Sequence, residues 1–254
     1  MSEIKESNHF LSSANKKITS IKKKYYARFA SRVVVFIATI LLYVFYPNAI
    51  DTMLGFNIFT TFNVMHIFYI LWIIDITMQF LPLTGHFSIG SLKHFQKYMK
   101  SIKIKDELSN IKLMIRKQIE ANKGAFKVLV VWLILTIGIG LLKIFHIISH
   151  REIFIISSFF YLCDLICVLF FCPFQKWFMH NKCCATCRIF NWDHMMMFSP
   201  FIFVIGFYSW SLVLLSLISM LIWEFTYYAH PERFFEESNE NLRCKNCKEK
   251  MCRR

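Results

Sequence analysis

Four long apolar runs are the feature that most constrains what this chain can fold into. They cover about residues 31–47, 54–81, 125–145 and 153–172, and a transmembrane α-helix needs about 20 apolar residues to cross about 30 Å of hydrocarbon. Backbone polar groups that face lipid must be bonded within their own segment, which a helix achieves. The composition agrees, because 56% of the residues are hydrophobic, against about 45–50% in soluble domains. The sequence therefore predicts an all-α, polytopic helical membrane bundle with four transmembrane helices.

A fifth apolar segment, at residues 198–229, has two possible courses. As one helix it would reach about 48 Å, whereas two halves would reach only about 24 Å each, which is short for two crossings. Length thus favours a single span. Pro200, Gly206 and the polar patch at 209–211 favour a re-entrant hairpin, which is tolerated where the break is buried in protein. The many Lys and Arg residues after position 230 also favour the hairpin.

The positions of Lys and Arg predict the orientation. Residues 1–30 and 83–124 are strongly basic, whereas the turns at 48–52 and 146–152 are almost free of Lys and Arg. The positive-inside rule then predicts a multi-pass protein of the cell membrane with a cytoplasmic N-terminus. The Lys and Arg residues that give the chain its net charge of +14 flank the apolar runs. We therefore expect these residues to face anionic lipid headgroups, and we expect no nucleic-acid partner.

These features divide the chain into five parts. In order, they are a basic cytoplasmic amphipathic helix at 1–30, a first transmembrane hairpin at 31–82, a basic cytoplasmic loop with an amphipathic helix at 83–124, membrane helices at 125–229 with a cysteine loop at 173–198, and a cysteine-containing tail at 230–254. The amphipathic helices are expected to lie on the membrane surface, because their apolar residues recur at helical spacing among the lysines.

Two cysteine groups carry the most specific chemical signal. The loop has a C-C-x-x-C pattern and the tail a C-x-x-C-x-x-x-x-C pattern, formed by Cys183, Cys184, Cys187, Cys244, Cys247 and Cys252. Two residues between cysteines let one turn present both sulfurs to one ion, and two such pairs suit a tetrahedral four-thiolate site. Zinc, iron or an iron–sulfur cluster would fit these ligands. The alternatives are one pair acting as a dithiol, or reduced thiols with no special role.

The fourth apolar run contains further cysteines. Cys163 and Cys167 are one helical turn apart, and cysteine in such a helix commonly serves as a small apolar residue. Cys172, near the cytoplasmic end of this run, could join the loop cluster.

Ionisable residues inside the apolar runs form a second candidate site. His66, Asp75 and Asp164 would be costly in hydrocarbon, so we expect them to face the bundle interior. There they could line an ion or proton path. Polar contacts between helices are the alternative.

Three functions remain open at this stage. The first is a cytoplasmic-face cysteine site that binds zinc, iron or an iron–sulfur cluster, either structural or as a redox relay to a membrane partner. The second is a small ion or solute transporter or channel component, and the third is a membrane scaffold that binds lipid or a further subunit, including a second copy. No phosphate-binding glycine loop, His-Glu-x-x-His or Gly-x-Ser-x-Gly motif occurs, and the sequence assigns no enzymatic activity.

Overall fold

The computed structural model describes residues 20–56, 63–80, 91–102 and 107–246 of the chain. Within these ranges the regular structure is helical and no strand occurs, which confirms the predicted all-α bundle. The α-helices are α2 (Ser20–Phe45), α3 (Pro47–Asp51), α4 (Val64–Met78), α5 (Glu107–Ile144), α6 (His150–Leu169), α7 (Asp193–Phe198) and α8 (Phe207–Ala229).

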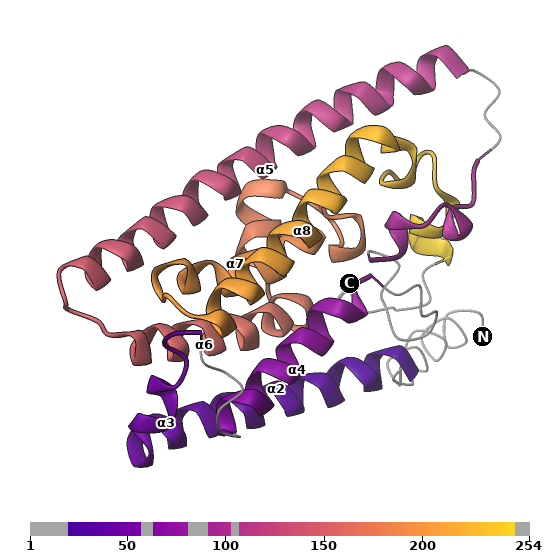
Figure 1. Ribbon diagram of the computed structural model, residues 1–254. Coiled ribbons are helices and arrows are strands. Elements are labelled where there is room, and N and C mark those ends of the chain that lie inside the picture. Colours follow the sequence, from indigo (N-terminus) through magenta and orange to yellow (C-terminus); the bar gives the residue numbers. More distant parts are fainter. Residues whose placement is uncertain (1–19, 57–62, 81–90, 103–106, 247–254) are drawn as a thin grey trace, which may run out of the picture.

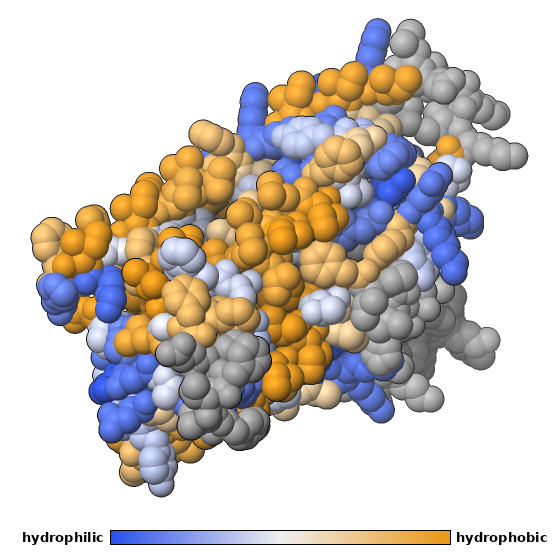
Figure 2. Space-filling view, viewed as in Figure 1, coloured by the Kyte–Doolittle hydropathy of each residue, from blue (hydrophilic) through white to orange (hydrophobic). Residues whose placement is uncertain are grey.

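Four helices are long and apolar enough to span a membrane, as predicted, but they are not the predicted four. The candidate spans are Lys22–Phe45, Ile111–Ile144, His150–Leu169 and Phe207–Ala229. The second apolar run forms α4, a shorter apolar helix of 15 residues, and α8 supplies the fourth long helix. Hydrophobic side chains cover the middle of α5 and α8, and hydrophilic side chains gather toward both ends (Figure 2). Four such helices are compatible with a multi-pass membrane protein.

The two ends of the bundle differ in the number of Lys and Arg residues. Figure 1 shows which elements lie at each end. The basic end holds the start of α2 and the start of α5, with the segments 91–102 and 230–246, and it contains most of the Lys and Arg residues. At this end the tail pairs with the segment before α5, since the Glu240 amide donates to the Lys100 carbonyl at 2.8 Å. The turn end holds α3 and the link between α5 and α6, where Arg151 pairs with Asp51. That ion pair lowers the pKa of Asp51 to about 2, chiefly through the hydrogen bond from Arg151.

The last apolar segment doubles back inside the bundle. Its first leg starts at the basic end, where Asp193 bonds Gln79, and reaches the turn end, where the Ile205 carbonyl accepts a hydrogen bond from the Gly55 amide at 3.2 Å. From Gly206 the helix α8 returns to the basic end. The segment therefore forms a hairpin that turns at Gly206. Its second leg, α8, is one unbroken helix long enough to span a membrane and includes the polar patch at 209–211. The cysteine loop and the tail lie at the same end.

Burial explains how so short a first leg can cross the bundle. It consists of α7 and the 3-10 helix at Ser199–Phe203, and a 3-10 helix rises about 2 Å per residue, more than an α-helix does. Met197, Phe198, Phe201 and Val204 are all at most 1% exposed. These residues pack against protein, whereas Ile202 is 43% and Ile205 63% exposed. The leg is thus buried on one side, where its irregular backbone packs against the other helices.

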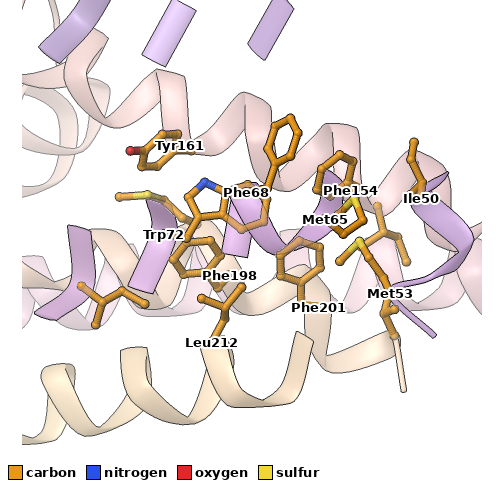
Figure 3. Packing of buried hydrophobic residues seen from close by; sticks show 14 of the residues in the cluster. Ile50, Met53, Met65, Phe68, Trp72, Phe154, Tyr161, Phe198, Phe201 and Leu212 are labelled. Atoms are coloured by element: carbon orange, nitrogen blue, oxygen red, sulfur yellow. The ribbon is translucent and has the colours of Figure 1, made fainter. Parts of the chain in front are cut away.

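An aromatic cluster fills the core between the first leg and the other helices (Figure 3). Trp72 of α4 is 1% exposed, and its ring centroid lies 5.4 Å from that of Phe198 and 5.6 Å from that of Phe154. Phe201 lies 5.8 Å from the same ring. Large apolar rings in such contacts dominate core packing energy, so the first leg is held chiefly by aromatic packing against α4 and α6.

Two predicted surface helices are continuous with membrane spans. Helix α2 runs without a break from Ser20 to Phe45, and residues 1–19 of the expected helix at 1–30 lie outside the described residues. Likewise α5 covers 38 residues, or about 57 Å, and joins the amphipathic part of the 83–124 loop to the third span. No proline interrupts either junction, so nothing in the local sequence ends these helices.

Replacing Gly206 with alanine should destabilise the hairpin. A Cβ atom at this position would lie 2.0 Å from the Met53 carbonyl oxygen, whereas one at Gly138 would meet no atom within 4 Å. We expect Gly206→Ala to cost about 1–3 kcal/mol, as overpacking does, and Gly138→Ala to cost less. Thermal unfolding in detergent measures both, and equal melting temperatures for the two variants would contradict the close approach.

Candidate functional site

Arg32 of α2 lies between two carboxylates inside the bundle. Its Nη1 donates to Asp164 Oδ2 at 2.6 Å, and its Nη2 donates to Asp75 Oδ2 at 2.8 Å. The guanidinium also donates to the Tyr161 carbonyl at 2.7 Å and lies 4.0 Å from the centre of the Tyr161 ring. The Arg32 side chain is only 8% exposed. A buried charge must be paired and hydrogen-bonded, and these contacts join α2, α4 and α6.

A second set of polar contacts extends this ion pair to α7 and α8. Gln79 Nε2 lies 2.6 Å from His194 Nδ1 and donates to Asp193 Oδ1 at 3.1 Å. Ser219 Oγ donates to Gln79 Oε1 at 2.8 Å, and His194 Nε2 lies 3.6 Å from Asp75 Oδ2. We call the whole set the Arg32 network, which consists of Arg32, Asp75, Gln79, Asp164, Asp193, His194 and Ser219.

The structure brings together two of the three predicted path residues. Asp75 and Asp164 share Arg32, which the sequence analysis did not single out, although a lone arginine within an apolar helix is a usable signal. His66 lies elsewhere, toward the turn end, where its Nε2 is 3.1 Å from the Tyr208 hydroxyl and its ring helps to cap α4. His66 does not line the cavity described next. An ion path through these residues stays a prediction.

A cavity of about 430 Å³ lies against the Arg32 network near the basic end. One part of its wall is formed by charged and polar members of that network. Another part carries thiols, from Cys163, Cys167, Cys172, Cys184 and Cys187. The apolar lining includes Tyr25, Leu71, Ile74, Trp132, Phe160 and Phe174. A concave, mostly apolar pocket with a few convergent polar groups is the usual form of a small-molecule site.

Two of the cavity thiols, Cys167 and Cys172, lie on either side of the end of α6. Cys167 lies in the last turn of α6, and Cys172 follows the helix just before Pro173. The backbone N–H of Gln175 donates to Cys172 Sγ at 3.4 Å. The neighbouring Cys167 side chain first, and the backbone N–H groups that face Cys172, lower the pKa of Cys172. Because a thiolate is the reactive form of cysteine, Cys172 is suited to act as a nucleophile.

The cysteine loop is fixed to α8 and to the tail through buried cations. Arg188 forms a two-point ion pair with Glu224, which also accepts a hydrogen bond from Trp192 Nε1 at 2.7 Å. Lys93 Nζ donates to the Cys187 carbonyl at 3.4 Å and lies 5.1 Å from the Phe234 ring centre. Burial raises the pKa of the Cys187 thiol. The contacts of Arg188 and Lys93 hold the cysteine loop in place, and the loop forms part of the cavity wall.

The predicted metal ligands are only partly within the described residues. Cys183, Cys184 and Cys187 lie in the loop, and Cys244 is exposed in the tail at the same end of the bundle. Cys247 and Cys252 lie outside the described residues. Among the residues that the structure describes, no three His, Cys, Asp or Glu side chains are placed so that they could hold one ion. The joint metal site stays a prediction.

Removing the charge of Arg32 should lower the free energy of unfolding of the bundle more than removing a surface charge does. Arg32→Gln leaves Asp75 and Asp164 without their cation, and loss of one partner of a buried ion pair costs about 3–5 kcal/mol. Adding Asp164→Asn removes a second charge and should restore part of the loss. Melting temperatures in detergent, with Lys23→Gln as the exposed control on α2, test this. A double variant no more stable than Arg32→Gln alone would contradict the pairing.

Comparison with known proteins identified no relative of this chain. No family model matches the chain, and neither a curated protein nor a solved structure matches it. The function is therefore argued below from the chemistry of the cavity and its walls.

Proposed function

We propose that this membrane protein performs thiol–disulfide redox chemistry at Cys167 and Cys172. The observation that carries the proposal is that these two free, partly exposed thiols lie in the wall of one cavity that could admit a small molecule. Thiol pairs that react reversibly need one thiolate for attack and a neighbouring thiol that resolves the intermediate. Cys172 supplies the first and Cys167 the second.

The surroundings of the pair support this division of roles. Gln175 holds Cys172 through its backbone N–H and accepts a hydrogen bond from Cys184 Sγ at 3.1 Å through its side chain. Cys172 is partly exposed, as a reacting thiol must be, whereas Cys187 in the same wall is buried. Reactive cysteines lie in partly exposed sites with hydrogen-bond donors, and buried cysteines are usually inert.

Alkylation kinetics test the proposed nucleophile. In the intact protein, reaction of Cys172 with iodoacetamide should rise with pH through a midpoint below that of an ordinary thiol, because the thiolate reacts and the pKa of Cys172 is lowered. Cys167→Ala removes the neighbouring thiol from beside Cys172 and should shift this midpoint upward, toward the about 8.5 of a free thiol. Peptide mass spectrometry measures the rate at each cysteine.

Cys163→Ser is the matched control, since Cys163 lies one turn before Cys167 and lines the same cavity. It should leave the Cys172 midpoint unchanged. A Cys172 that titrates like a free thiol in the unmodified protein, or absence of a Cys167–Cys172 disulfide after mild oxidation with diamide, would refute the proposal.

A second proposed function is metal or cluster binding at the basic end. The specific observation in its favour is the return of the last segment, which leaves the cysteine loop and the tail at one end of the bundle. We propose Cys184, Cys187, Cys244 and Cys247 as four thiolate ligands for zinc, iron or an iron–sulfur cluster, with Cys183 and Cys252 as alternatives. The basic end would then face the cytoplasm, as the positive-inside rule predicts.

Metal content separates the two proposals. Protein purified without oxygen should contain zinc or iron in a fixed ratio to the chain, and Cys244→Ser with Cys247→Ser should remove most of it. Cys167→Ser and Cys172→Ser should leave the metal in place, because these residues belong to the other site. Metal-free protein, or metal that the tail variants do not affect, would eliminate the joint site.

A further inference from the structure

We infer that the cavity binds a lipid-soluble quinone, which oxidises the Cys167–Cys172 pair. This inference rests on the proposed redox function and adds the chemical class of the electron acceptor. Forming a disulfide from two thiols releases two electrons and two protons, so the acceptor must take both. Quinones do so in one molecule, and small disulfides do so as well. The cavity wall favours the quinone.

The lining of the cavity suits a planar apolar ring. Its volume of about 430 Å³ lies within the range of about 300–1,000 Å³ that is usual for small-molecule sites. Aromatic and aliphatic side chains contribute much of its wall, among them Tyr25, Leu71, Ile74, Trp132, Phe160 and Phe174. A peptide disulfide carries several charges, and burying them in such a wall would be costly.

The position of the cavity also favours a ligand that dissolves in the bilayer. Helices α2 and α6, which are candidate membrane spans, both contribute wall residues, and so does the apolar helix α4. Cys167 lies near the end of the α6 span, so the pair sits at the margin of the apolar part of the bundle. A quinone concentrated in the bilayer would therefore be close to the thiols.

Polar groups in the wall match the carbonyl oxygens of a quinone. Arg28, Arg32, Gln79 and His194 all line the cavity. Arg32 uses three of its five N–H donors on Asp75, Asp164 and the Tyr161 carbonyl. Preorganised donors stabilise negative charge as it develops on an oxygen, which is what happens when a thiolate adds to a quinone.

The proposed step balances without a further reactant. The Cys172 thiolate adds to a ring carbon of the quinone, forming a C–S bond while the carbonyl oxygen takes up negative charge. Cys167, on losing its proton, attacks Cys172 Sγ. The S–S bond forms, the C–S bond breaks, and its electron pair stays with the ring. The two protons that leave the thiols convert the reduced ring to the quinol.

A single-turnover assay tests the inference. The full chain in detergent is reduced with dithiothreitol, desalted without oxygen and mixed with a decyl-substituted benzoquinone, whose absorbance reports its reduction. We expect one quinone reduced per protein, with a Cys167–Cys172 disulfide as the other product. Cys167→Ser and Cys172→Ser should slow the reaction at least about tenfold, as loss of a nucleophile or its resolving partner does. Cys244→Ser should not slow it, because Cys244 is exposed in the tail and does not line the cavity.

A cavity-filling variant separates reaction in the cavity from reaction at the surface. Val168 lines the cavity, and Val168→Phe should slow quinone reduction while iodoacetamide, a smaller reagent, still modifies Cys172. Unchanged quinone reduction in folded Val168→Phe would overturn the inference. If oxidised glutathione forms the Cys167–Cys172 disulfide but the quinone does not, the inference fails and the redox function stands. If neither oxidant forms it, both fail.

Discussion

The pairing of Arg32 with Asp75 and Asp164 is the interaction on which the rest of the structure depends. Taking three charges out of water is costly, and the cost is offset only when their hydrogen bonds are made to one another. Those bonds fix α2, α4 and α6 at one depth in the bundle. Through His194 the same network also fixes the start of the first leg of the hairpin. The cavity lies directly against this network, so its shape follows from the ion pairs.

The hairpin formed by the last apolar segment places the cysteine loop in the wall of the cavity. By returning to the basic end, α8 presents Glu224 to Arg188 and so packs the cysteine loop as a wall beside the α6 thiols. A straight last helix would have left the tail at the turn end. One side of its irregular first leg is buried in protein, where Phe198 and Phe201 pack against Trp72.

Sequence patterns anticipated parts of the candidate site but not its composition. Asp75 and Asp164 were expected inside the bundle because charge is rare in apolar helices, and both lie there. Cys167 was interpreted as a small apolar residue, and in the structure it lies with Cys172 in the wall of one cavity. Nothing in the local spacing distinguishes these interpretations. Cys167 and Cys172 are five positions apart on either side of the end of α6. They can come together only if the chain turns back after Leu169.

The sequence by itself determined that this chain forms membrane-spanning helices, because apolar length and the need to bond the backbone in lipid are local properties. It also narrowed the last segment to two courses through Pro200 and Gly206. Only the tertiary structure decided which polar groups meet. Arg32 is 43 positions from Asp75 and 132 from Asp164, and contacts at such separations depend on how all the helices pack together. The cavity and its thiol wall follow from that packing.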